Sequence, residues 1–145
     1  MRCALPGLLQ AKFLARILAT AIALFSNPLT AEYATHVAYA LHCGGCHLAD
    51  GRGNPPEVPD LRNELGKIVM LPGGRDYLVR VPGASQAPVS DQQLANIVNW
   101  VLENYNAETL PADFEPLTAE EVGRSRKNVL SDPLKYRSEL WMNYK

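Results

Sequence analysis

The chain is poor in the side chains that build most metal sites and disulfide frameworks. It contains 3 cysteines and 3 histidines in 145 residues. Only one pair of cysteines lies at short spacing, and no second cysteine or histidine pair accompanies it. A structural zinc site usually needs such a second pair. The sequence therefore does not favour a zinc-binding domain.

An excess of positive charge is also lacking. The chain has 14 basic and 15 acidic residues, and its formal net charge is −1. All the acidic residues follow residue 31, so that part of the chain is more acidic than the whole. This argues against nucleic acids and anionic lipid surfaces as partners. We see no internal repeat and no low-complexity tract, and the length after residue 31 suits one small domain.

The first 31 residues contain no acidic side chain. Arg2, Lys12 and Arg16 precede an apolar run over 17–25, and the small residue Ala31 follows shortly after it. This layout predicts a signal peptide over residues 1–31, cleaved near Ala31, and an exported, periplasmic protein. The run is short for a membrane span, so we expect no membrane attachment after cleavage, although an uncleaved anchor is the alternative.

The cysteine pair belongs to the segment Cys43-Gly44-Gly45-Cys46-His47. Cys-x-x-Cys-His is the attachment signature of c-type haem. The two thiols each form a thioether to the porphyrin, and the adjacent histidine is the proximal iron ligand. The sequence thus predicts one covalent haem c, held by Cys43, Cys46 and His47.

Two other uses of the motif are weaker. A thioredoxin-like redox pair needs a βαβ context, whereas the residues around the motif have a helical pattern. A structural disulfide between Cys43 and Cys46 leaves His47 unexplained.

The apolar pattern predicts a mostly helical chain. Residues 33–42 place Tyr33, Val37, Ala40 and Leu41 on one face of a helix that ends at the motif. Ser90 and Gln93 form a capping box before a helix over about 91–105. A short helix is expected over about 75–81, and another from Thr118 to about Leu130. Residues 48–60 and 82–89 are rich in turn-forming residues and predict loops.

The motif and the helices on either side of it resemble a class I, monohaem c-type cytochrome over about residues 33–105. The resemblance implies an all-α fold: a small cytochrome c-like domain, residues 32–105, around one covalent haem. Residues 106–145 are then a C-terminal extension that packs on the core or on a partner. The resemblance also matches Pro59 and Leu61 to a proline and leucine of the family, and implies that the Pro59 carbonyl accepts a hydrogen bond from the outer nitrogen of His47.

The sixth iron ligand departs from the family pattern. Relatives place a Met-Pro pair shortly before the C-terminal helix, whereas this chain has Ala87-Pro88. Three interpretations stay open. Met70 is the sixth ligand, or it is a core methionine. His36 or His42 ligates instead. The position is open or holds water, as in small-ligand-binding or peroxidase-like haem proteins.

The resemblance implies an electron carrier rather than an enzyme. Single electrons would pass between protein redox partners as the iron cycles between Fe(III) and Fe(II). Arg75 is the candidate partner of a haem propionate. The protein acts as a monomer or, as an alternative, as the haem subunit of a larger periplasmic dehydrogenase or oxidase complex. Donor and acceptor are not specified by the sequence.

Overall fold

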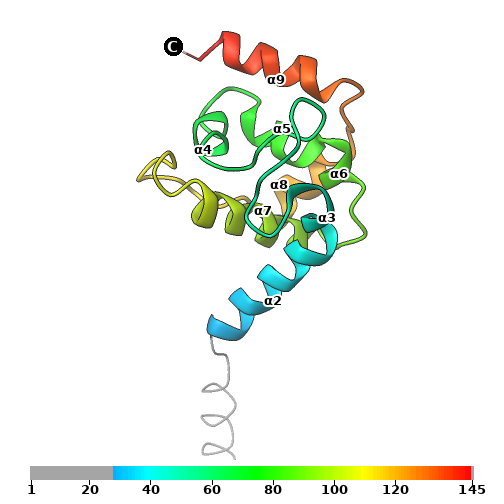
Figure 1. The fold of residues 1–145 in the computed structure, drawn as a ribbon, viewed down its shortest axis with the longest axis vertical. Coiled ribbons are helices and arrows are strands. Elements are labelled where there is room, and N and C mark those ends of the chain that lie inside the picture. Colours follow the sequence, from blue (N-terminus) through cyan, green and yellow to red (C-terminus); the bar gives the residue numbers. More distant parts are fainter. Residues whose placement is uncertain (1–27, 145) are drawn as a thin grey trace, which may run out of the picture. The chain divides into compact units, whose positions relative to one another are not determined.

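The computed structural model describes residues 28–144, with side chains from residue 32 onward. The helices are α2 (Pro28–His42), α3 (Gly44–His47), α4 (Leu65–Ile68), α5 (Gly74–Arg80), α6 (Pro82–Ser85), α7 (Asp91–Tyr105), α8 (Ala119–Ser125) and α9 (Pro133–Met142) (Figure 1). Between residues 28 and 144 there is no strand, only an isolated bridge of Asn54 with Val58. The predicted all-α fold is confirmed for this part of the chain.

Residues Ala34–Lys145 form one compact unit, and it is this unit that carries the motif. Most of the predicted signal peptide, residues 1–27, lies outside the described residues. Among the helices that the structure describes, none has the length and apolar character to cross a membrane.

Helix α7 is the predicted 91–105 helix, with the predicted cap. The Ser90 side chain accepts a hydrogen bond from the backbone N–H of Gln93, and the Gln93 side chain accepts one from the backbone N–H of Ser90. The buried side chains of the helix recur at helical spacing: Leu94, Ala95, Ile97, Val101 and Leu102. This apolar stripe forms the centre of the core, as its sequence pattern predicts.

The segment after α7 packs on the same core. Leu117, Val122, Leu130 and Leu140 are all buried. The Tyr136 ring of α9 stacks on the Tyr77 ring of α5, with centroids 6.0 Å apart. The backbone N–H of Leu130 donates to the carbonyl oxygen of Arg80 over 2.9 Å. Residues 106–144 therefore fold back against α5 and α7.

Three local expectations need correction. The segment 82–89 contains the short helix α6, which begins at Pro82, a favoured residue in a first helical turn. Helix α8 ends at Ser125, well before Leu130. On α2 the buried side chain is Tyr39, whereas Val37, Ala40 and Leu41 are exposed. The apolar face of α2 identified from spacing is thus not the face that packs on the core.

Candidate haem-attachment site

Helix α3 brings the three chemical groups of the motif together. The backbone N–H groups of Cys46 and His47 donate to the carbonyl oxygen of Cys43 over 3.2 and 3.0 Å. This single turn places Cys43, Cys46 and His47 at helical positions i, i+3 and i+4, which share one face. Both thiols are free, with Cys43 half-buried and Cys46 exposed. Burial raises the pKa of the Cys43 thiol.

The His47 imidazole is set into the protein with one nitrogen enclosed. Nδ1 is buried and has no hydrogen-bond partner of normal geometry. Burial lowers the pKa of His47, while the neighbouring Pro59 carbonyl and Asp60 carboxylate oppose that shift. The ring is therefore neutral at neutral pH, the form in which histidine ligates metals. With Nδ1 enclosed, Nε2 is the nitrogen available to a metal.

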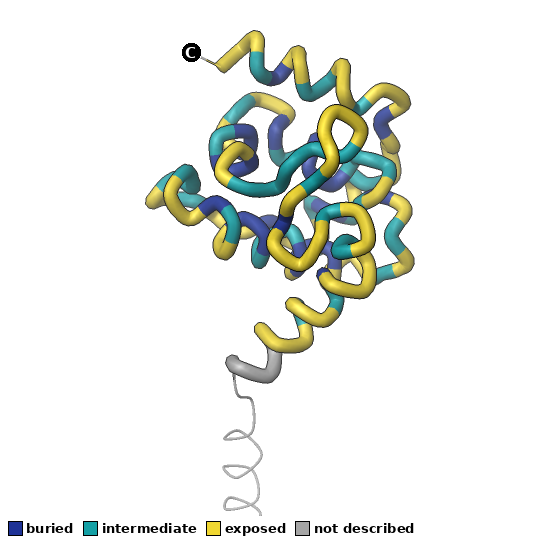
Figure 2. The backbone as a smooth tube through the Cα atoms, viewed as in Figure 1, coloured by how far each residue is buried: buried dark blue, intermediate teal, exposed yellow. Residues whose placement is uncertain are grey.

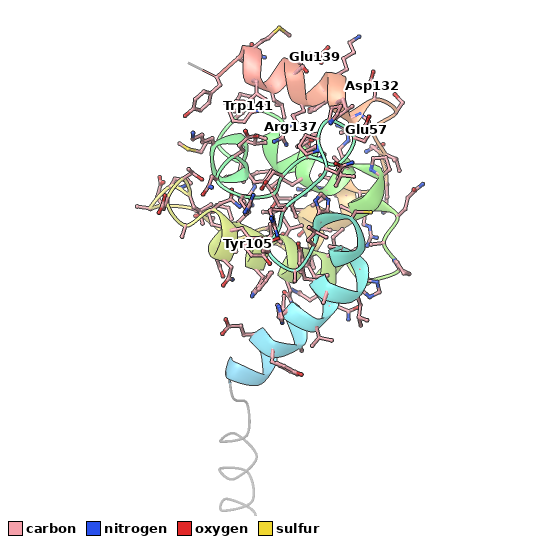
Figure 3. The ribbon with its side chains drawn as sticks, in the orientation of Figure 1. Glu57, Tyr105, Asp132, Arg137, Glu139 and Trp141 are labelled. Carbon is pink, nitrogen blue, oxygen red and sulfur yellow. The ribbon has the colours of Figure 1, made fainter. Side chains whose placement is uncertain are left out.

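Two tyrosine hydroxyls hold the backbone that follows the motif. The hydroxyl of Tyr39, on α2, donates to the carbonyl oxygen of Leu48 over 2.8 Å and lies 3.3 Å from that of His47. The hydroxyl of Tyr105, at the end of α7, donates to the carbonyl oxygen of Ala49 over 2.7 Å. Figure 3 shows Tyr105 beside this segment. Neither tyrosine was singled out as part of the site by sequence reasoning.

An aromatic cluster lies at the same place. The Trp100 ring lies 5.3 Å from the Tyr39 ring and 5.2 Å from the Tyr105 ring, measured between centroids. The His36 ring is 5.3 Å from Trp100. The cluster joins α2 to α7 directly behind the motif, so the helix that delivers Cys43 is anchored to the core.

The loop after α3 returns to His47 through Pro59. A side chain on Gly53 has no room, because its Cβ would stand 2.0 Å from the Val58 carbonyl oxygen and 2.6 Å from that of Pro59. Glycine at this position lets the two sides of the loop close. The predicted hydrogen bond from Nδ1 of His47 to the Pro59 carbonyl is not formed with normal geometry. The carbonyl nevertheless favours the protonated imidazole and so opposes the lowering of the pKa of His47 by burial.

Charged residues occupy the same loop. Asp60 binds the guanidinium of Arg62 through two contacts, of 2.9 Å to Nε and 2.6 Å to an Nη. These hydrogen bonds lower the pKa of Asp60, so its carboxylate is ionised at neutral pH. An ion pair, with its carboxylate on Asp60, therefore lies next to Pro59, on the histidine side of the site.

Asn106 connects this loop to α7, and its importance is not visible in the sequence. Its side chain is fully buried. The amide oxygen accepts from the backbone N–H groups of Leu65 and Gly66, and the amide nitrogen donates to the carbonyls of Leu61 and Val101. Leu61 itself is partly buried against the core. Only the C-capping position after an amphipathic helix hints at this role.

The candidate sixth ligands lie as follows. Met70 follows α4 and its side chain is 63% exposed, so the interpretation of a core methionine is wrong. His36 and His42 are both exposed. Met142, on α9, is 75% exposed. Ligation by Met70 stays a prediction.

Arg75 is bound to the C-terminal segment. Its guanidinium lies 2.6 and 2.8 Å from the two carboxylate oxygens of Glu121, and it donates to the carbonyl of Glu115 over 2.8 Å. The predicted contact with a propionate would have to compete with this bidentate ion pair.

The donor set of the motif fits a haem better than a bare metal ion. Within residues 28–144, no group of three or more His, Cys, Asp or Glu side chains is arranged to hold a metal ion. The motif instead offers two thiols and one imidazole on one face. Leu41 and Leu48 beside it are 74% and 47% exposed, which provides apolar surface for a porphyrin. A Cβ at Gly45 would meet no protein atom within 4 Å, so the turn between the two cysteines is not packed against the rest of the protein.

Comparison with known proteins agrees with this chemistry. No protein-family model matches the chain. Cytochrome c-552 of Thermus thermophilus is 29% identical over 107 residues, covering 61% of this chain and 82% of the relative. A second cytochrome c-552, from a particular strain of the same organism, is also 29% identical over 107 residues, covering 61% of this chain and 72% of the relative. The chain is thus distantly related to these c-type cytochromes, and its Cys-x-x-Cys-His motif and all-α fold are compatible with a single haem.

Proposed function

We propose that the protein is an exported electron carrier with one haem c, bound covalently through Cys43 and Cys46 and ligated by His47. The observation that supports this most directly is the arrangement of the three groups on the single turn of α3. The similarity to proteins named cytochrome c-552 supports the same function. A bound haem supplies one-electron Fe(III)/Fe(II) chemistry.

The residues of this chain set the conditions for that chemistry. His47 offers a neutral imidazole whose enclosed Nδ1 leaves Nε2 for the iron. The ionised carboxylate of Asp60 beside Pro59 would favour the more positive oxidation state, and its ion pair with Arg62 reduces that effect. The exposed Cys46 places one attachment point of the haem at the surface, where a redox partner can approach. Such partners form weak, transient interfaces.

Covalent attachment is tested by expressing the full chain in bacteria that export and mature c-type cytochromes. We expect the mass of the purified protein to increase by one haem, and the alkaline pyridine spectrum to be that of haem c. Cys43→Ser and Cys46→Ser should each lose one thioether, and the double variant should lose both, whereas Met142→Ala serves as the control and should keep both. A wild-type protein without covalent haem contradicts the proposal.

Export is tested on the same preparation. We propose that residues 1–31 are a signal peptide removed near Ala31, and that residues 106–145 are an extension of the cytochrome domain. The N-terminal sequence of the mature protein should begin at or near Glu32. A protein that retains residues 1–31 and stays with the membrane fraction supports an uncleaved anchor instead.

A second candidate is a haem protein that binds small ligands at an open sixth position. The presence of Ala87 before Pro88, where relatives place a methionine, favours it. Optical spectra with and without carbon monoxide separate the two. If Met70 ligates, the wild type resists carbon monoxide, Met70→Ala binds it, and Met142→Ala behaves as wild type. If the position is open, all three proteins bind carbon monoxide readily.

Membership of a larger oxidoreductase is the other alternative. A complex with a dehydrogenase or oxidase predicts co-purification with a second polypeptide. A monomer at all working concentrations supports the independent carrier.

A further inference from the structure

The backbone directly after the motif turns sharply and is held by side chains from two helices. Leu48 has a φ of 52°, a value that a non-glycine residue adopts only where its surroundings hold it. The carbonyl oxygens of His47, Leu48 and Ala49 are three in succession, and each lies within reach of a tyrosine hydroxyl. We call Tyr39 and Tyr105 the tyrosine clamp.

The clamp is rigid because both rings are fixed by packing. Tyr39 is fully buried, and its ring meets the Tyr105 ring edge-on at 5.7 Å between centroids. Trp100 contacts both rings. The hydroxyl of Tyr39 has one proton, which goes to the nearer acceptor, the Leu48 carbonyl at 2.8 Å. Burial raises the pKa of both tyrosines, so they stay protonated donors at neutral pH.

The position of the clamp connects it to the histidine. His47 is the last residue of α3, and its side-chain orientation depends on the backbone at 47 and 48. The hydrogen bonds that tie the carbonyls of His47, Leu48 and Ala49 to α2 and α7 come from the hydroxyls of the clamp. Without these hydroxyls, the described hydrogen bonds of these carbonyls would no longer join the backbone after His47 to either helix. A packing role alone needs only the two rings and gives no reason for both hydroxyls to reach successive carbonyls.

We propose that Tyr39 and Tyr105 are positioning residues for the proximal ligand, which keep His47 in one orientation through their hydroxyls. This inference rests on the proposed function, since it takes His47 to be the iron ligand. It predicts that removing a hydroxyl, with the ring retained, allows His47 a second orientation while the fold persists.

The test compares Tyr39→Phe, Tyr105→Phe and the double variant in the full, haem-loaded protein. Tyr136→Phe is the matched control, because its ring also packs in the core region, on Tyr77, but it lies on α9 away from the motif. Electron paramagnetic resonance of the ferric protein reports the number of haem environments. Since one hydrogen bond contributes modestly, we expect a minor second species to grow about fivefold for each hydroxyl removed.

A readout that does not depend on haem accompanies it. Hydrogen exchange of the amides over 44–51 should accelerate in Tyr39→Phe, while exchange in α9 stays unchanged. Tyr136→Phe should leave both readouts as in the wild type.

The outcomes separate the clamp from the proposed function. Haem attachment with an unchanged resonance spectrum and unchanged exchange in the clamp variants overturns the clamp and leaves the electron carrier intact. A lowered unfolding temperature as the sole change has the same meaning, since it assigns the tyrosines to packing alone. A wild type without haem overturns the proposed function, and with it the role in ligand positioning, even where exchange accelerates.

Discussion

The motif-bearing part of the compact unit, residues 34–62, differs from residues 63–144 in how it is packed. Of its apolar side chains only Tyr39 is fully enclosed, whereas the other buried hydrophobic residues all lie between Leu65 and Leu140. Figure 2 shows the same contrast, with α2 and the segment after α3 largely exposed, whereas α5 is mostly buried and α7 carries a buried stripe along one face. The polypeptide thus builds its core in one part and presents its reactive groups on the other.

The contrast teaches that the two parts are stabilised by different means. Residues 63–144 depend on apolar burial, the main driving force of folding. Residues 34–62 are joined to that core by the ring contacts of Tyr39 with Trp100 and Tyr105, and by the hydrogen bonds of Tyr105 and Asn106 to the loop after the motif. The proposed haem would add apolar packing where the chain itself has little.

The largest effect should come from removing the attachment groups. If a haem covers about 200 Å² of apolar surface beside the motif, it adds about 5 kcal/mol of stability. The double variant Cys43→Ser/Cys46→Ser should therefore unfold at a much lower temperature than the haem-bearing wild type, as followed by far-ultraviolet circular dichroism. Met142→Ala, an exposed residue on α9, is the control and should melt as wild type. Equal unfolding temperatures for all three proteins would show that residues 34–62 do not depend on a haem for their stability.

The next effect concerns the junction between the two parts. Asn106→Ala leaves the N–H groups of Leu65 and Gly66 and the carbonyl of Leu61 buried without their partner. We expect a loss of about 3 kcal/mol in the free energy of unfolding, measured by urea denaturation. Asn104→Ala, an exposed residue on the same helix end, should cost less than about 0.5 kcal/mol. Similar losses in both variants would argue against a special role of Asn106.

A smaller effect is expected within the loop of the motif. Gly53→Ala sets a Cβ against the Val58 carbonyl oxygen at 2.0 Å, so residues 58 and 59 must move. We expect a loss of about 2 kcal/mol in the free energy of unfolding. The haem spectrum should also change, because Pro59 lies beside the proximal ligand His47. Gly83→Ala is the control, because its Cβ would meet nothing within 4 Å. An unchanged haem spectrum in Gly53→Ala would show that the position of Pro59 does not influence His47.

The ion pair of Arg75 and Glu121 tests how much a polar contact contributes to the stability of residues 63–144. Arg75 lowers the pKa of Glu121 through their hydrogen bonds, although burial opposes the shift. The contribution of Glu121 is thus fully present above its ordinary pKa of about 4.3 and is lost as the pH falls through its lowered value. Glu121→Gln should lower the free energy of unfolding by about 1 kcal/mol at pH 7. It should also make the free energy of unfolding less dependent on pH in the acidic range. Glu120→Gln, exposed on the same helix, should leave that pH dependence unchanged.

The smallest effect is electrostatic. Ferric haem carries one more positive charge than ferrous haem, so a nearby carboxylate favours the ferric form. Asp60→Asn should raise the reduction potential by on the order of 20 mV, measured by redox titration. Glu139→Gln, on α9, should shift it less. A lower potential in Asp60→Asn would have the opposite sign and would exclude this role for the carboxylate.

The sequence predicted the helical elements best where local rules act alone. The capping box at Ser90 and the apolar spacing up to Tyr105 together determined the bounds of α7. The α2 face was misjudged because spacing cannot tell which of two apolar stripes meets the core. Tyr39, rather than Val37 or Leu41, is chosen by its contacts with Trp100 and Tyr105, which lie far along the chain.

The site follows the same division. Cys43, Cys46 and His47 are recognisable in the sequence because covalent haem attachment requires this spacing of two cysteines and a histidine. The roles of Asn106 and Tyr105 are not, because their partners are backbone groups more than 40 residues away in the chain or on a distant loop. Arg75 has the right charge for a propionate, but its ion pair with Glu121 depends on how the C-terminal segment folds back.

Arg126, at the end of α8, also binds backbone far from it in sequence. Its guanidinium donates to the carbonyl oxygens of Ser85, Ala87 and Val89. Protein synthesis runs from the N-terminus to the C-terminus, so this loop lacks its binding partner until the last part of the chain has been made. A chain shortened to end before residue 126 would therefore leave three carbonyl groups of this loop without this donor, so the segment ahead of α7 depends on the C-terminal extension for its hydrogen bonds.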